Sequence, residues 1–158
     1  MINIGLEANE REGLTHLLQG VLADQHVLYI KTRNFHWNVV GPRFSQLHAF
    51  FEEQYTDLAE SIDEVAERIR MLGGTPIASM AEFLQHARLS EHSGAVPKSD
   101  EMIVALVNDH ETIIRQLRGD LETANEKFHD AGTSDFCTGL LQDHEKMAWM
   151  LRAHLESA

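Results

Sequence analysis

The sequence is poor in cysteine, in basic residues and in long apolar runs. Cys137 is the single cysteine among 158 residues, so no disulfide can form within the chain and a reducing compartment is expected. No apolar stretch approaches the roughly 18 residues of a membrane-spanning helix. Residues 1–12 lack the basic and apolar regions of a secretory signal. Together these absences predict a cytoplasmic chain without a membrane anchor.

Charge is strongly one-sided, with 13 Lys and Arg against 25 Asp and Glu and a formal net charge of -12. Such a chain repels phosphate, which makes it a poor non-specific ligand for DNA or for anionic membranes, and it attracts cations. Ten histidines direct attention to metals. The length and the 43% hydrophobic content predict one domain over residues 1–158 with a sizeable core.

Four long segments carry apolar residues at spacings of three and four, which predicts four amphipathic helices. They cover about 9–37, 42–72, 99–129 and 133 to nearly 158, and glycine or proline separates them. The second segment is the most regular. Its apolar stripe consists of Phe44, Leu47, Phe51, Tyr55, Leu58, Ile62, Val65, Ile69 and Leu72.

Helix starts are marked by capping patterns. Asn9 with Glu12 resembles a capping box for the first helix, Pro42 suits the first turn of the second, and Ser99 is a suitable cap for the third. The fourth helix is expected to begin near residues 133–135.

The connection between the second and third helices exceeds twenty residues, far more than most bundle loops. It includes a short helical piece at about 79–87, in which Ser79 and Glu82 occupy capping-box positions. A long crossover lets the second and third helices run parallel. The predicted fold is therefore all-α, a ferritin-like four-helix bundle whose long crossover carries a short helix between helices 2 and 3.

Four candidate metal ligands share one face of the second helix: His48, Glu52, Asp63 and Glu67. At 100° per residue they fall within about 100° of arc, away from the apolar stripe. The small Ala59 and Ala66 lie on the same face and would let another helix approach closely.

Distance divides these four residues into two pairs. Glu52 and Asp63 are eleven residues apart, or about 16 Å along the axis, whereas bonds to a transition metal are only about 2 Å long. One chain therefore cannot bring both pairs to one ion. An antiparallel second copy, related by a two-fold axis near residues 57–58, would complete two identical sites at once.

His36 ends the first helix and would join this site if the first two helices are antiparallel neighbours. Two imidazoles and three carboxylates suit iron, manganese or zinc. Carboxylates one turn apart are more often a solvated face, and periodicity alone leaves that alternative open.

The stretch from Asn34 to Ile69, NFHWNVVGPRFSQLHAFFEEQYTDLAESIDEVAERI, resembles the signature of the Dps family of mini-ferritins. The resemblance implies that all five residues are catalytic metal ligands: His36, His48 and Glu52 from one chain, Asp63 and Glu67 from its two-fold partner. Some relatives have aspartate where this chain has Glu52. Trp37 matches a family tryptophan and is interpreted either as core packing or as a sink for oxidising equivalents.

The resemblance further implies a hollow homo-dodecamer with two-fold interfaces through the second helix. Fe(II) and hydrogen peroxide would be the substrates, with peroxide as the preferred oxidant. The ferric product would be stored as oxyhydroxide, which protects against oxidative damage. Zinc or manganese would compete for the di-iron site. Asp135, with Glu126 and Asp130 as weaker candidates, would line entry pores, and the alternative for each is an ordinary helix-end carboxylate.

The main alternative function is DNA compaction, to which the family name refers. Many relatives bind DNA through basic tails, whereas here residues 1–8 carry no Lys or Arg and residues 155–158 read LESA. We expect no strong DNA binding. An adhesion or activation role for the same shell stays open. The pair Glu126 and His129 has a ferritin-type spacing but no second copy, and we interpret it as surface. Cys137 and most remaining histidines are expected to be packed or on the surface.

Overall fold

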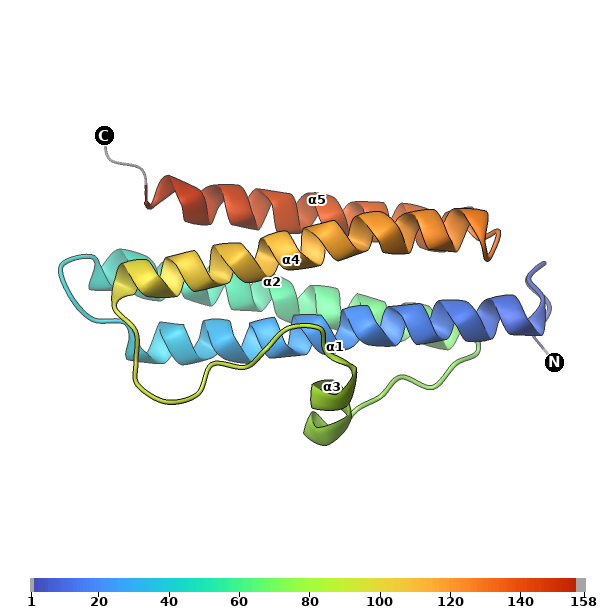
Figure 1. Cartoon of the computed structure of the whole chain (residues 1–158), viewed down its shortest axis with the longest axis horizontal. Coiled ribbons are helices and arrows are strands. Elements are labelled where there is room, and N and C mark those ends of the chain that lie inside the picture. The colour runs from blue at the N-terminus through green and yellow to red at the C-terminus, as the bar shows by residue number, and fades with distance from the viewer. Residues whose placement is uncertain (1, 156–158) are drawn as a thin grey trace.

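The computed structural model describes residues 2–155, and residues 1 and 156–158 lie outside them. The helices are α1 (Ala8–Asn38), α2 (Phe44–Met71), α3 (Met80–His86), α4 (Ser99–Glu126) and α5 (Ala131–Ala153). Four of them form a bundle, and the short α3 lies against its side (Figure 1). Between residues 2 and 155 the chain has no strand, and none of its helices is long and apolar enough to cross a membrane.

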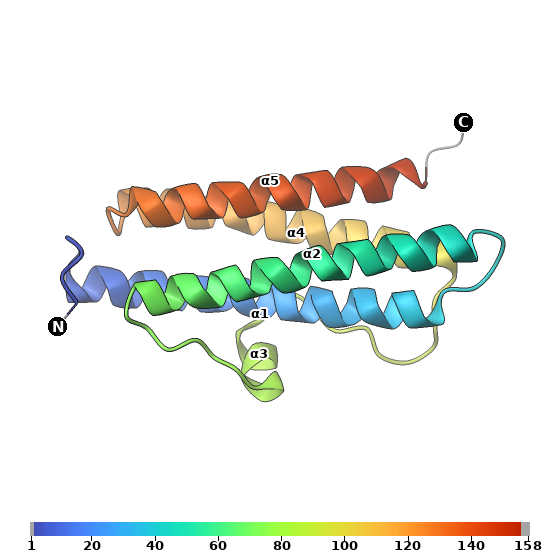
Figure 2. The same ribbon diagram turned by 180° about the vertical axis from the view of Figure 1, so that it is seen from behind.

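The bundle consists of two antiparallel hairpins. Helices α1 and α2 form one, α4 and α5 form the other, and both views show each pair side by side (Figures 1 and 2). The crossover runs from the end of α2 back to the end of the bundle where α2 began, so α2 and α4 are parallel. The predicted ferritin-like bundle, with a short helix in the crossover, is confirmed.

Apolar periodicity placed the core correctly. Most of the α2 stripe is fully buried, including Leu47, Phe51, Leu58, Val65 and Ile69. Its ends and flanks behave differently: Phe44 is 45% exposed, and Tyr55 and Ile62 are only half-buried. The apolar stripe in the sequence therefore includes residues at its end and along its edges that the bundle does not fully bury.

Several helix ends differ from the sequence prediction. The capping box of α1 uses Glu7 and Glu10 instead of Asn9 and Glu12, with the Glu7 N–H donating to the Glu10 carboxylate at 2.8 Å. Helix α5 begins at Ala131, two residues early, because the Asp130 carboxylate accepts from the Gly132 N–H. It ends at Ala153 rather than close to residue 158.

Helix α4 ends at Glu126, three residues before the predicted end at about 129. The break follows from the left-handed backbone of His129, whose φ is 54°. In contrast, the α3 capping box is confirmed, since Ser79 and Glu82 exchange hydrogen bonds at 3.1 and 3.3 Å.

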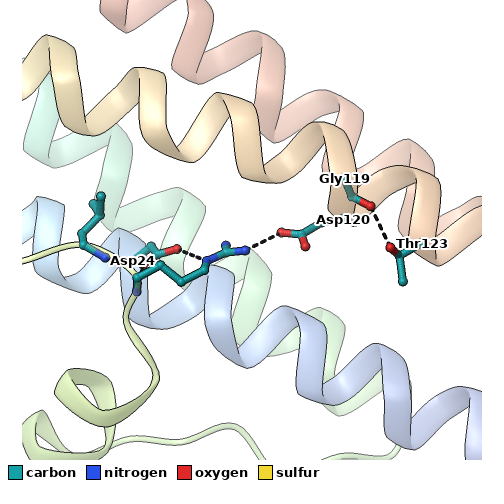
Figure 3. A network of polar contacts seen from close by, with 6 residues as sticks. Asp24, Gly119, Asp120 and Thr123 are labelled. Atoms are coloured by element: carbon teal, nitrogen blue, oxygen red, sulfur yellow. Dashed lines mark hydrogen bonds and ion pairs between the residues drawn. The ribbon is translucent and has the colours of Figure 1, made fainter.

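A buried ionic contact holds the crossover against the bundle. Asp24, on α1, has no exposed surface and accepts hydrogen bonds from the backbone N–H of Arg88 at 2.6 Å and of Leu89 at 3.1 Å. The Arg88 side chain bonds Asp24 at 2.7 Å and reaches Asp120, on α4, at 3.1 Å (Figure 3). The Arg88 side chain thereby ties the segment after α3 to α1 through Asp24 and to α4 through Asp120.

Candidate metal centre

The short link between α1 and α2 brings three predicted ligands together. His36 lies in the last turns of α1, and His48 and Glu52 lie one turn apart near the start of α2. One ligand atom from each lies within 4.8 Å of the others. Among residues 2–155 this is the one group of three or more His, Cys, Asp or Glu side chains that is close enough to share a metal ion.

Reciprocal hydrogen bonds fix both imidazole rings. Nδ1 of His36 lies 2.7 Å from the backbone oxygen of His48, and Nδ1 of His48 lies 2.9 Å from the backbone oxygen of His36. Because a carbonyl oxygen only accepts, each Nδ1 must donate, which leaves each Nε2 with a free lone pair whenever its ring is neutral. This arrangement is typical of metal-binding histidines.

The two rings stack with centroids 3.8 Å apart and planes inclined by 21°. Tyr55 lies edge-on to His36 with a centroid distance of 5.3 Å, and the Phe44 ring lies 5.1 Å from that of His48, tilted by 30°. Exposure increases across the group: His36 is 7% exposed, His48 is half-buried and Glu52 is exposed. The site is thus rigid on its inner side and open to an approaching ion or chain on the other.

Asp63 and Glu67 do not join this group. Both are exposed further along α2, as the axial spacing of the helix requires. The small-residue face is open beside them, where a shallow groove of about 320 Å³ is lined by Ala59, Ala66 and Asp63. That a second copy brings Asp63 and Glu67 to the histidines stays a prediction.

Trp37 does not pack in the core of the chain, so that interpretation is wrong for the single subunit. Its side chain is 62% exposed because it follows His36 and points away from the bundle. The guanidinium of Arg33 lies over its ring, 4.8 Å from the centroid, and also lies within 6 Å of the Tyr29 and Tyr55 rings. Tyr55, which the sequence indicated only as part of an apolar stripe, therefore contacts both His36 and this cationic-aromatic cluster.

The three pore candidates lie near the α4–α5 connection but differ in their surroundings. Glu126 and Asp135 are exposed. Asp130 caps α5 and accepts from Thr133 at 2.5 Å and from Arg68 at 2.9 Å. Burial favours the neutral acid, but the Thr133 hydrogen bond and the Arg68 charge together hold the pKa of Asp130 below its ordinary value. Asp130 thus has a role in the fold, and a pore role for any of the three stays a prediction.

The remaining histidines divide as expected between surface and interior. His16 and His129 are exposed, as is Glu126, which agrees with the surface interpretation of the Glu126–His129 spacing. His110 and His144 are fully buried. The sequence carried a signal for both, since each occupies an apolar position in the stripe of its helix.

Comparison with known proteins agrees with the fold. A family model described as Ferritin-like domain matches residues 15–158. An uncharacterised low temperature-induced protein of Nostoc sp. is 51% identical over 98% of this chain and 87% of its own. DNA protection during starvation protein 2 of Bacillus anthracis is 42% identical over 88% and 94%, respectively.

Among solved structures, the Dps protein of Vibrio cholerae superposes with a TM-score of 0.91 and 36% identity, covering 99% of this chain and 97% of that one. It is described as a member of a broad superfamily of ferritin-like diiron-carboxylate proteins. DpsC of Streptomyces coelicolor gives a TM-score of 0.95 at 26% identity, over 100% and 92% of the two chains. On this evidence the chain belongs to the Dps family of ferritin-like proteins.

Proposed function

We propose that this chain is an iron-sequestering mini-ferritin. In this proposal it oxidises Fe(II), preferentially with hydrogen peroxide, at di-iron sites between two-fold-related subunits of a hollow dodecamer. The ferric product is stored inside as oxyhydroxide, which removes a source of oxidative damage. The observation that carries the proposal is the half-site of His36, His48 and Glu52, whose imidazoles keep both Nε2 atoms free.

The half-site supplies two nitrogen donors and one carboxylate, fewer than two iron ions need. Asp63 and Glu67 from the partner subunit would raise the set to two imidazoles and three carboxylates. Fe(II) is the substrate, and anionic oxygen donors stabilise the ferric product more than the ferrous substrate because the product has the higher charge. Zinc and manganese prefer similar donors and would compete.

Two adjacent ferrous ions give the site its proposed preference for peroxide. Each ion loses one electron, the O–O bond of hydrogen peroxide accepts both and breaks, and two protons complete two molecules of water. Hydrolysis of the two ferric ions then releases protons and yields oxyhydroxide. Because both electrons are delivered together, no hydroxyl radical leaves the site.

A complementation experiment tests the shared site. One variant carries His36→Ala with His48→Ala, and the other carries Asp63→Ala with Glu67→Ala. Each is first assayed alone by anaerobic Fe(II) titration followed by peroxide, and both are expected to show little oxidation above that of iron in solution. Co-expressed mixed shells place one intact half from each chain at the same two-fold interface, which restores about half of the sites in every mixed pair.

Recovery in mixed shells with inactivity of both parents supports ligands from two chains. Full activity of the Asp63→Ala, Glu67→Ala variant alone contradicts the proposed site. The parents and the mixture are compared at equal assembly size, measured by light scattering, so that a failure to assemble is distinguished from loss of ligands.

DNA compaction is not proposed, although relatives are named for DNA protection. The net charge of -12 opposes the counterion release on which such binding depends. A gel-shift assay at neutral pH, moderate salt and without divalent metal is expected to show no retained complex, and a tight complex there would contradict this expectation.

A further inference from the structure

A chain of polar contacts crosses the centre of the bundle, away from the proposed iron site. Nε2 of Gln25, on α1, lies 2.8 Å from Oγ of Ser61, on α2, and 3.3 Å from Nε2 of His144, on α5. Nδ1 of His144 lies 2.9 Å from Nδ1 of His110, on α4. Gln25, His110 and His144 are at most 1% exposed. All four long helices therefore contribute to one buried polar network.

Hydrogen bonding within the protein does not satisfy this network. Oε1 of Gln25 and Nε2 of His110 are buried without a partner. If the Gln25 amide is turned over, its oxygen gains partners but its nitrogen then has none, and Nε2 of His110 still lacks a partner. Buried polar atoms without partners are rare because each loses its water without compensation. Burial also lowers the pKa of both histidines, so at neutral pH the rings are uncharged and their nitrogen lone pairs can bind a metal.

A groove of about 280 Å³ between α2 and α5 meets this network at Ser61. Ser61 lines the groove and bonds Gln25, which in turn reaches His144. Acidic side chains surround the groove, among them Asp57, Glu64 and Asp143, and the thioethers of Met147 and Met150 also line it. Carboxylates gather cations, and thioether sulfur favours soft ions such as Cu(I).

We propose that His110 and His144 form a binding site for one cuprous ion, which reaches them through the methionine-lined groove between α2 and α5. No Asp, Glu or Cys completes a three-ligand group with these histidines within residues 2–155. A divalent ion would bring two uncompensated charges into the core, and a monovalent ion brings one. Cuprous copper is monovalent, soft and stable with two nitrogen ligands.

Binding requires only a change of tautomer and a small ring movement. The ion takes the place of the proton between the two Nδ1 atoms, and that proton is carried instead by Nε2 of His144, so both rings stay neutral. With metal–nitrogen bonds of about 2 Å, the Nδ1 atoms separate from 2.9 Å to about 4 Å. Once the Gln25 amide turns over, its oxygen accepts from His144 Nε2–H and from the Ser61 hydroxyl, so the Gln25 nitrogen and His110 Nε2–H are the atoms left without a partner.

The test is anaerobic Cu(I) competition against bicinchoninate, using the full chain under ascorbate. The starting protein carries His36→Ala and His48→Ala, so that the candidate iron site does not contribute. We expect it to retain about one cuprous ion per chain, with X-ray absorption reporting two nitrogen neighbours at about 2 Å. Adding His110→Leu or His144→Leu should abolish retention. Adding Met147→Leu with Met150→Leu should slow uptake and leave the final stoichiometry unchanged.

His16→Ala, at an exposed histidine, is the matched control and should retain copper in full. Circular dichroism verifies that each variant is helical, and His110→Gln replaces His110→Leu if the latter fails to fold. Failure of the starting protein to retain copper, or full retention in the folded His110 variants, overturns the proposal and leaves the pair as a structural hydrogen bond. A sulfur-only shell in X-ray absorption also overturns it, because the ion would then be in the groove.

Discussion

Asp24 and Arg88 form an ion pair at 2.7 Å in which the carboxylate has no exposed surface and the guanidinium lies at the edge of the bundle. Two backbone N–H groups of the crossover also point at Asp24. This contact holds the long crossover in place, and that crossover is what allows α2 and α4 to run parallel.

Replacing Asp24 should therefore strongly destabilise the fold. Asp24→Ala leaves two crossover N–H groups without an acceptor and leaves the Arg88 charge with Asp120 alone. Removing one partner of a buried pair costs on the order of 3–5 kcal/mol. Urea denaturation followed by circular dichroism measures the loss. The matched control is Arg118→Ala, which breaks an exposed pair with Glu145 and should cost no more than about 1 kcal/mol. Equal losses in the two variants would contradict the role given to Asp24.

The two nitrogens of His48 should be separable by substitution. His48→Asn keeps a donor where Nδ1 bonds the His36 carbonyl but removes the Nε2 ligand, whereas His48→Gln places an amide near the Nε2 position and loses the inner bond. We expect His48→Asn to remain close to the parent in thermal stability and to lose at least about 10-fold in Fe(II) affinity. Calorimetric titration of Fe(II) without oxygen measures the affinity. Unchanged iron affinity in His48→Asn would show that Nε2 is not a ligand.

Much of this fold was predictable because apolar spacing and breaker residues are local signals. The stripe of α2, the capping box at Ser79 and the parallel arrangement of α2 and α4 all followed from the sequence. Helix ends were less predictable. Asp130 competes with the neighbouring Thr133, Ser134 and Asp135 as a cap, and α1 begins after Glu7 although Asn9 is the stronger capping residue. The His129 backbone that ends α4 early has no sequence signal as clear as glycine.

The candidate site was likewise predictable only in part. Spacing placed His48 and Glu52 on one face, and the short α1–α2 link placed His36 beside them. The reciprocal bonds between the histidines and each other's backbone were beyond sequence reasoning, because they depend on how two helices meet. The exposure of Trp37 was equally unpredictable, since adjacent residues on a helix point about 100° apart and His36 is the one facing inward.

Cys137 should stay inert while the protein handles peroxide. It is fully buried, and burial raises the pKa of its thiol to about 12, so almost no reactive thiolate exists at neutral pH. We expect iodoacetamide to label native protein at a small fraction of the rate seen in urea, and peroxide turnover to leave the thiol reduced. Intact-mass spectrometry measures both. Rapid labelling of the native protein would show that the helix around Cys137 opens more readily than its packing implies.

The buried histidine pair should make the bundle sensitive to mild acid. Burial lowers the pKa of His144 to about 4, and burial together with the neighbouring His144 lowers that of His110 well below 6.5. Because the unfolded chain takes up protons near pH 6.5 and the folded chain does not, stability is complete above that pH. It falls as the pH drops toward about 4, and the loss from His144 alone is on the order of 3 kcal/mol.

Urea denaturation at intervals between pH 7 and 5 isolates this effect, since carboxylates titrate mainly below that range. His144→Leu removes one titrating group and should flatten the decline over the same interval, whereas His16→Ala, at an exposed histidine, should leave the slope unchanged. Equal slopes for the parent and His144→Leu would mean that the pair takes up protons without unfolding, and the neutral state assigned to these rings would be wrong.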